Sequence, residues 1–127
     1  MATLLDSSVW VALYLDNDTQ HDKAKHFFSR LTGRLYLTYG VVSEVATILT
    51  YKHSKAQADL FLDFVTQNSE IVWLESPTNE DVKYFQTISV RISFIDASLV
   101  RLAKALQVPL ITFDKQLARL VKQTRKS

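Results

Sequence analysis

Four acidic residues stand at positions where a charged side chain is unexpected. They are Asp6, Glu44, Asp96 and Asp114. Asp6 ends the apolar run 3–5, and Asp114 directly follows the largely apolar stretch 109–113. A carboxylate that is buried without a partner loses several kcal/mol of hydration free energy, so each of these positions requires an explanation.

Two of the four acids share a helical face with apolar residues. Asp96 lies on the same face as Leu99 and Ala103, at the spacings i+3 and i+7. Glu44 stands in the same relation to Ile48, at i+4. This pattern predicts that both carboxylates lie on or beside buried helix faces, where solvated surface acids are rarely found.

Capping and ion pairing are the simplest explanations for these acids. Asp6, Asp96 and Asp114 each stand near the start of an expected helix, where a carboxylate accepts hydrogen bonds from free N–H groups. Taken singly, capping suffices for each of the three. Lys52 or Arg91 could neutralise one buried carboxylate, but two are less easily explained in this way.

The elements that must position the acids alternate between strand and helix. Short apolar runs predict strands at 3–6, 35–38, 71–74 and 109–113. Helical spacing and capping residues predict helices at 9–15, 20–31 (ended by Gly33), 41–52, 55–67, from the turn at 77–79 to about 88, 93–106 and 114–121. The alternation predicts an α/β domain of three α/β/α layers around a parallel sheet of four to five strands. One domain spans residues 1–127, with a basic tail from about 121.

The predicted sheet brings two of the acids to one edge. Ligands of open parallel sheets bind beyond the carboxyl ends of the strands, where Asp6 and Asp114 both stand. If all four acids converge, each pair of charges about 5 Å apart repels by about 3 kcal/mol at an effective dielectric constant near 20. A hard divalent cation would neutralise them, and all-oxygen ligands favour Mg²⁺ or Mn²⁺ over Zn²⁺.

The composition removes most competing chemistries. Of the 127 residues, 47% are hydrophobic and 22% are charged, which is typical of a globular protein. The two glycines, Gly33 and Gly40, are too few for a P-loop or a dinucleotide fingerprint. No cysteine is present, and His21, His26 and His53 lack zinc-ligand spacing. Carboxylates are therefore the main candidates for chemistry.

Targeting signals and bulk charge say less about function. No apolar run approaches the roughly 20 residues of a membrane span, and the first residues lack the pattern of a signal peptide. We therefore expect a cytoplasmic protein that is not bound to a membrane. The formal net charge is only +2, although basic residues crowd the last third. These residues are Arg91, Arg101, Lys104, Lys115, Arg119, Lys122, Arg125 and Lys126. Solvated surface and phosphate binding both remain open as explanations of this cluster.

Four blocks of sequence carry a family resemblance that covers nearly the whole chain. They are Leu4 to Leu13, Ser43 to Thr47, Phe94 to Ala103 and Leu110 to Asp114. The first contains an aspartate that ends a strand, with a serine two places later, and the last ends in Thr-x-Asp. In this order and spacing the blocks resemble the PIN-domain ribonucleases, especially the VapC toxins of VapBC toxin–antitoxin pairs.

The resemblance implies a site and a reaction. Asp6 and Asp96 would be the principal metal ligands, and Glu44 and Asp114 would complete the acidic site directly or through water. Ser8 and Thr112 would orient these ligands by hydrogen bonds, although a cap and a strand-end hydroxyl explain them equally well. The activity implied is Mg²⁺- or Mn²⁺-dependent hydrolysis of RNA phosphodiesters by the toxin of a type II toxin–antitoxin system.

The implied partners are an RNA substrate and an antitoxin protein. A homodimer is left open, and nothing in the sequence reads a particular base. His21 also looks family-like, but we interpret it as an ordinary surface histidine. Two alternatives remain. A haloacid-dehalogenase-like phosphatase would need Asp-x-Asp where this chain has Asp6-Ser7-Ser8, and a catalytically silent PIN-fold binding module would keep the fold without the reaction.

Overall fold

A four-stranded parallel sheet forms the centre of the computed structural model, which describes residues 1–123. The strands are β1 (Ala2–Leu5), β2 (Arg34–Thr38), β3 (Ile71–Leu74) and β4 (Leu110–Ile111), in the order β3-β2-β1-β4. Leu4 of β1 pairs with Tyr36 on one side and Leu110 on the other, which makes β1 a central strand. The predicted α/β class and parallel sheet are confirmed.

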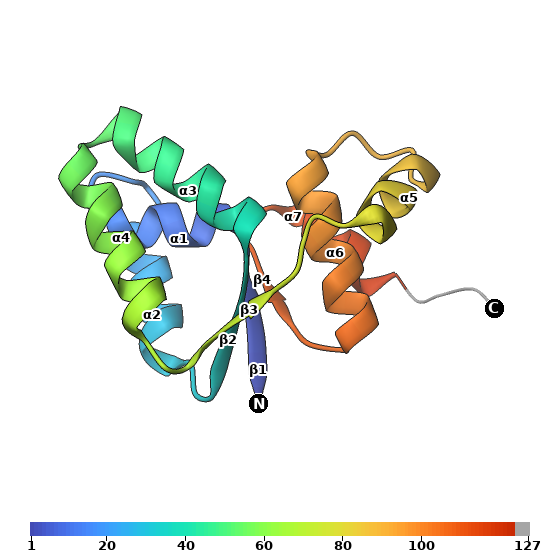
Figure 1. The fold of residues 1–127 in the computed structure, drawn as a ribbon, viewed down its shortest axis with the longest axis horizontal. Coiled ribbons are helices and arrows are strands. Elements are labelled where there is room, and N and C mark those ends of the chain that lie inside the picture. The colour runs from blue at the N-terminus through green and yellow to red at the C-terminus, as the bar shows by residue number, and fades with distance from the viewer. Residues whose placement is uncertain (124–127) are drawn as a thin grey trace.

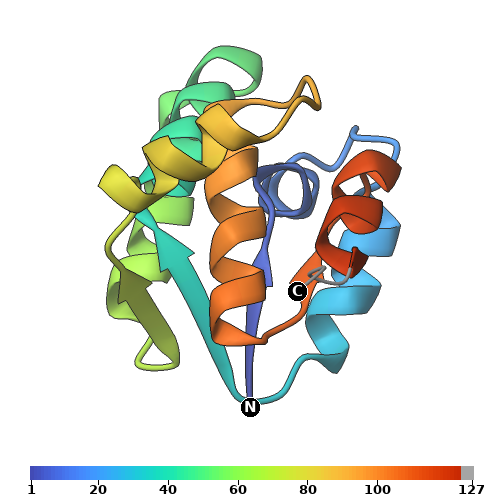
Figure 2. The ribbon, with the colours of Figure 1, turned by 90° about the vertical axis from the view of Figure 1, so that its right-hand side faces the viewer.

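Helices cover both sides of the sheet (Figures 1 and 2). One side carries α1 (Ser7–Tyr14), α2 (His21–Arg30), α3 (Tyr39–Lys52) and α4 (Lys55–Gln67). The other carries α5 (Asn79–Thr87), α6 (Phe94–Leu106) and α7 (Lys115–Lys122). Because both faces are covered, the strands are apolar along most of their length, as expected for a parallel sheet.

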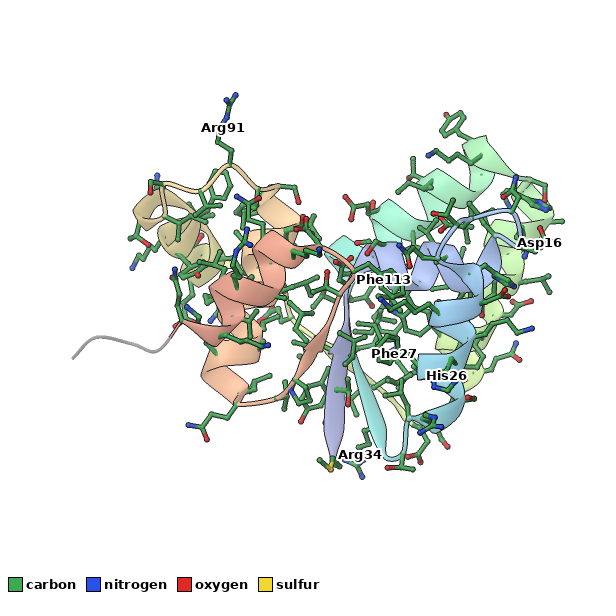
Figure 3. The ribbon with its side chains drawn as sticks, turned by 180° about the vertical axis from the view of Figure 1, so that it is seen from behind. Asp16, His26, Phe27, Arg34, Arg91 and Phe113 are labelled. Atoms are coloured by element: carbon green, nitrogen blue, oxygen red, sulfur yellow. The ribbon has the colours of Figure 1, made fainter. Side chains whose placement is uncertain are left out.

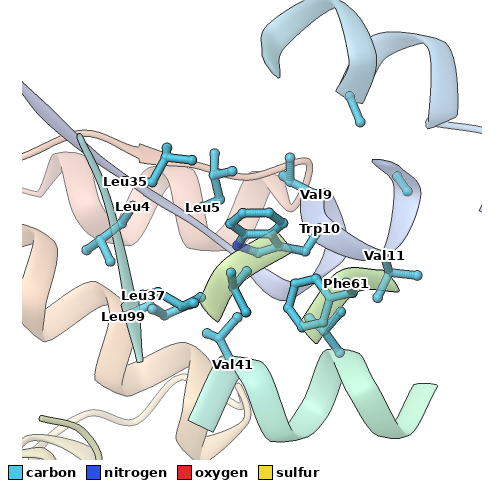
Figure 4. Packing of buried hydrophobic residues seen from close by; sticks show 14 of the residues in the cluster. Leu4, Leu5, Val9, Trp10, Val11, Leu35, Leu37, Val41, Phe61 and Leu99 are labelled. Atoms are coloured by element: carbon cyan, nitrogen blue, oxygen red, sulfur yellow. The ribbon is translucent and has the colours of Figure 1, made fainter. Parts of the chain in front are cut away.

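The core on the α1 side is built around one tryptophan (Figure 4). Trp10 is fully buried, and its ring meets those of Phe61 and Phe28 at centroid distances of 5.4 and 6.1 Å. Leu4 and Leu5 of β1 belong to the same cluster. The packing joins β1 to α1, α2 and α4, and so fixes the segment that follows β1 at the carboxyl edge of the sheet.

Helix starts depart from the prediction where a strand passes straight into a helix. The helices predicted to begin at 9 and 41 begin at Ser7 and Tyr39. The side chains of Asp6 and Thr38, the residues immediately before, accept hydrogen bonds from backbone N–H groups of the first turn. Each cap allows the helix to begin directly at the end of the strand. By contrast, α4 and β3 have the predicted bounds.

The predictions for 109–113 and for Gly33 were wrong in detail. Only Leu110 and Ile111 pair with β1, so the chain leaves the sheet before Thr112. Helix α2 ends at Arg30, and Gly33 lies in the following turn with φ of +85°. A Cβ atom there would stand 2.2 Å from the Met1 carbonyl oxygen, so the glycine permits the entry into β2.

The C-terminal helix overlaps the predicted basic tail. Helix α7 continues to Lys122, so the predicted basic tail overlaps the helix at its start. Residues 124–127, with Arg125 and Lys126, lie outside the described residues. Within residues 1–123, no helix is both long enough and apolar enough to cross a bilayer.

Candidate active site

A cavity of about 420 Å³ opens at the carboxyl ends of β1 and β4. All four acids singled out from the sequence line it: Asp6, Glu44, Asp96 and Asp114. Asp18, from the loop between α1 and α2, is a fifth. We call this cavity, with its five carboxylates, the acidic pocket. The structure thus brings the predicted site residues together, from segments far apart in the sequence.

Asp6 is the most buried acid of the pocket, with 3% of its surface exposed. Its Oδ1 accepts a hydrogen bond from the Ser8 backbone N–H at 2.5 Å, and its Oδ2 accepts one from the Thr112 hydroxyl. Asp6 therefore caps α1, as the simplest explanation held, and it also faces the pocket. Both oxygens are fixed in place by neutral donors, which leave the charge uncompensated.

Glu44 is half-buried on α3, between the buried residues Val41 and Val45. Its carboxylate accepts a hydrogen bond from the hydroxyl of Ser7, the first residue of α1. The contact joins α3 to the residue that directly follows Asp6. A carboxylate on α3 is thereby held beside the one at the end of β1.

Asp96 lies in the first turn of α6 and has the most perturbed charge of the pocket. Its pKa is raised from 3.8 to about 6, chiefly because the carboxyl is partly buried. The negative charges of Asp6 and Glu44, and more weakly of Asp114, raise this pKa further. The four acids therefore lie close enough for the charges of the other three to act on Asp96.

Asp114 is the exposed member of the set and caps α7. Its Oδ1 accepts hydrogen bonds from the backbone N–H groups of Gln116 and Leu117, at 2.8 and 3.3 Å. The Thr112 hydroxyl oxygen accepts a hydrogen bond from the Asp114 N–H at 3.0 Å. Since this hydroxyl also donates to Asp6, Thr112 links the two acids that follow β1 and β4.

Ion pairing does not explain the buried charges. Among residues 1–123, neither Glu44 nor Asp96 has a cationic nitrogen within ion-pair distance. Lys52 lines the pocket but forms no ion pair with any residue the structure describes, and the exposed Arg91 extends away from the rest of the molecule (Figure 3). The predicted ion-pair alternative is therefore wrong for both acids.

The donor set fits a hard cation that keeps much of its water. Within the described chain, no three His, Asp or Glu side chains close on a single point as a ready-made metal site. The carboxylates instead line a shared space and present oxygen atoms to it. Mg²⁺ is commonly bound in this way, through one or two carboxylates with water and substrate phosphate as the other ligands.

Comparison with known proteins identifies the family. Residues 3–123 match the family model described as the PIN domain. The chain belongs to the PIN domain family. This PIN domain is 26% identical over 125 residues to a VapC ribonuclease of Archaeoglobus fulgidus, an alignment that covers 91% of this chain and 79% of the relative.

A solved structure agrees with this PIN domain in fold. The crystal structure of VapC20 from Mycobacterium tuberculosis, described as a Sarcin-Ricin loop cleaving toxin, superposes with a TM-score of 0.83 at 16% identity. The match covers 92% of this chain and 93% of the other. The similarity extends over both helical layers and is not confined to the sheet.

Several pocket residues of this PIN domain were missed from the sequence. They are Ser7, Asp18, Gln20, Ser93 and Phe113, whereas Lys52 was considered only as an ion-pair partner. Ser8, which was singled out, contacts Asp6 through its backbone N–H, and the hydroxyl that meets an acid is that of Ser7. A serine next to a strand-end aspartate was a usable signal, whereas the path of the loop that carries Asp18 was not visible in the sequence.

His21 does not fit the predicted description of an ordinary surface histidine. It is half-buried, and its Nδ1 lies 2.7 Å from the Ala12 carbonyl oxygen of α1. Its backbone N–H donates to the Asp18 carbonyl oxygen at 3.0 Å. His21 therefore ties the start of α2 to α1 and helps to hold the loop that brings Asp18 to the pocket.

Proposed function

We propose that this PIN domain is a ribonuclease that hydrolyses RNA phosphodiester bonds with a divalent cation, Mg²⁺ or Mn²⁺, held in the acidic pocket. The observation that carries the proposal is the convergence on one cavity of four carboxylates, none of which has an ion-pair partner among residues 1–123. The similarity to a protein named VapC ribonuclease supports RNA as the substrate.

Asp6 and Asp96 are the proposed principal ligands, and Glu44 and Asp114 complete the site directly or through water. A cation bound there would activate water and offset the negative charge that develops on the phosphoryl group. Thr112 and the Ser8 N–H hold both oxygens of Asp6 in fixed directions. Ligand carboxylates with such fixed partners are pre-organised for a cation.

We further propose that the chain is the toxin of a type II toxin–antitoxin pair and acts in the cytoplasm. The similarities to VapC ribonuclease and to VapC20 support this assignment. An antitoxin protein is then the expected partner, and it would have to cover the acidic pocket or its approaches to silence the enzyme. A homodimer is compatible with this proposal, and size-exclusion chromatography of the purified chain would test it.

RNA cleavage across metal ions tests the ribonuclease proposal. We expect cleavage of single-stranded RNA with Mg²⁺ or Mn²⁺, its loss in EDTA, and its loss in the Asp96→Asn variant. The matched control is Asp63→Asn, because Asp63 is an exposed acid on α4, which contributes nothing to the acidic pocket. Cleavage that persists in EDTA, or in folded Asp96→Asn protein, would contradict the proposal. A folded wild-type chain that cleaves no RNA would point to the catalytically silent module.

A further inference from the structure

An aromatic pair and a lysine lie at the edge of the acidic pocket. Phe113, which directly precedes Asp114, lines the pocket among the carboxylates. Its ring centroid lies 6.2 Å from that of Phe27 on α2, and the Lys23 Nζ lies 5.5 Å from the Phe113 centroid. Figure 3 shows Phe27 and Phe113 lying close together beside α2.

The backbone fixes Phe113 in this place. The chain leaves the sheet after Ile111, and the Thr112 hydroxyl is bonded to both Asp6 and the Asp114 N–H. Phe113 is therefore held between two anchored residues. It is half-buried, so part of the ring packs against the core while part faces the pocket.

Core packing alone leaves the position of Phe113 partly unexplained. The part of the ring that faces the carboxylates stays in water, so it gains none of the free energy that burial of apolar surface supplies. A cation over the ring adds a weak attraction at an exposed site such as that of Lys23. An aromatic face with an adjacent cation is the combination that binds an unpaired nucleotide, by base stacking and by phosphate contact.

The charge of the acidic pocket favours a nucleotide-binding site at its edge. Its carboxylates repel every phosphate except the one that a metal ion would hold, so the flanking nucleotides need favourable contacts elsewhere. Lys23 is exposed on α2 and can turn from the ring toward a phosphate without leaving its helix. Bases are free to stack on a side chain in single strands, loops and bulges, but not within a duplex.

We propose that Phe113 and Lys23 form a nucleotide subsite next to the metal site. Phe113 stacks against an unpaired base beside the scissile phosphate, and Lys23 binds the phosphate of that nucleotide. The inference rests on the proposed ribonuclease function and adds to it a contact with one unpaired base beside the scissile phosphate. It also assigns to Phe113 a binding role that is distinct from the metal-holding role of its neighbour Asp114.

Abasic RNA separates stacking from a structural role. The probe is a short fluorescein-labelled single-stranded RNA, together with versions that carry one abasic nucleotide at successive positions. Binding is measured by fluorescence anisotropy with Mg²⁺ in the Asp96→Asn background, so that the RNA stays intact. We expect one abasic position to weaken binding by about tenfold when Phe113 is present.

The variants of Phe113 give the decisive comparison. Phe113→Leu should weaken binding of the intact RNA by about tenfold and abolish the extra loss at the sensitive abasic position. Phe113→Trp should restore both the affinity and the abasic sensitivity, which also shows that the site tolerates substitution without unfolding. Intact RNA that binds Phe113→Leu as tightly as its parent, or an unchanged abasic sensitivity, would overturn the subsite.

The lysine is tested by charge and salt. Lys23→Gln should weaken binding of every RNA in the series by a similar factor, and lower the slope of log affinity against log salt by about 0.7. Lys25→Gln is the matched control, because Lys25 is an exposed lysine on the same helix with no aromatic partner among the described residues. Equal effects of the two substitutions would overturn the role of Lys23.

RNA cleavage assays without the Asp96→Asn substitution distinguish an error in the proposed subsite from an error in the proposed ribonuclease function. We expect Phe113→Leu to raise KM by about tenfold while kcat changes much less, because stacking contributes to ground-state and transition-state binding alike. A wild-type enzyme that cleaves RNA while Phe113→Leu keeps its KM would end the subsite alone. A wild-type chain that neither binds nor cleaves RNA would end both proposals.

Discussion

Asp81 and Asp96 lie on consecutive helices and show two opposite treatments of a buried carboxylate. Asp81 is fully buried in the first turn of α5. It accepts hydrogen bonds from the Ser76 hydroxyl and the Thr78 N–H, each at 2.7 Å, and its Oδ1 lies 2.5 Å from the Arg101 Nε. Asp96 is less buried, yet it has no cation among the described residues and lies in the field of three other acids.

The difference separates a carboxylate that is neutralised within the fold from one whose charge has no partner among residues 1–123. Helix α6 carries both Arg101, which neutralises Asp81, and Asp96, which faces the acidic pocket. The same helix therefore supplies a cation to one carboxylate and none to the other. Burial by itself would favour Asp81 as a functional residue, whereas the lack of a counter-charge among residues 1–123 supports our proposal that Asp96 is one.

The largest effect on stability is expected from substitution of Asp81. Asp81→Ala should lower the free energy of unfolding by about 3–5 kcal/mol, because it leaves the half-buried Arg101 with a long 3.9 Å contact to the exposed Glu80 and removes the Asp81 half of the α5 capping box. Urea unfolding near neutral pH measures the loss, with the exposed Asp63→Ala as control. A loss below about 1 kcal/mol, the size expected of a surface ion pair, would contradict the structural role.

Asp96 should behave in the reverse manner. Asp96→Asn should reduce RNA cleavage by about a hundredfold or more, since even partners of metal ligands contribute 10- to 100-fold. It should leave the stability of the metal-free protein unchanged or increased, because it removes one of several mutually repelling charges. Single-turnover cleavage and urea unfolding in EDTA measure the two effects. An Asn variant that is less stable than wild type in EDTA would erase the contrast with Asp81.

The raised pKa of Asp96 makes the stability of the metal-free protein depend on pH. The folded protein holds the Asp96 proton up to about pH 6, whereas the unfolded chain releases it near 3.8. Between these values the unfolded state binds fewer protons, so this group makes the metal-free protein less stable as the pH rises. Urea unfolding in EDTA at several pH values should show this decline in wild type and a smaller one in Asp96→Asn. Parallel pH profiles of the two proteins would contradict the shift.

A smaller effect is expected at the hydroxyls that hold the acids. Thr112→Val should reduce cleavage by about tenfold, because Asp6 loses a donor that fixes one of its oxygens. The control is Thr66→Val, since the Thr66 hydroxyl donates to carbonyl oxygens of its own helix and lies outside the acidic pocket. Steady-state cleavage at saturating Mg²⁺ measures the change. Equal activity of Thr112→Val and wild type would contradict a role for Thr112 in positioning Asp6.

Much of the fold was predictable because local signals agreed with one another. The bounds predicted for α4, 55–67, are those of the structure, and its residues Ala58, Phe61 and Val65 are buried at helical spacing. The end of β4 was not predictable, because the apolar character of Phe113 continues the strand pattern while its backbone turns toward the site. Only the pairing with β1 decides where that strand stops.

Site residues were predictable where an acidic residue stood in an otherwise apolar pattern. Asp96 on an apolar stripe and Asp6 at a strand end stood out by their position. Asp18 and Lys52 carried no such signal, because they reach the pocket through a loop path and the length of a helix. The partnership of Asp81 with Arg101 depends on how α5 packs against α6, which no local pattern encodes.

Binding of Mn²⁺, followed by electron paramagnetic resonance, tests the central claim most directly. The account predicts a saturable site in wild type that is weakened by about tenfold or more in Asp96→Asn. The site should be unchanged in Asp81→Asn at a temperature where that variant stays folded. Equal binding by all three proteins, or no saturable binding by wild type, would contradict a cation site in the acidic pocket.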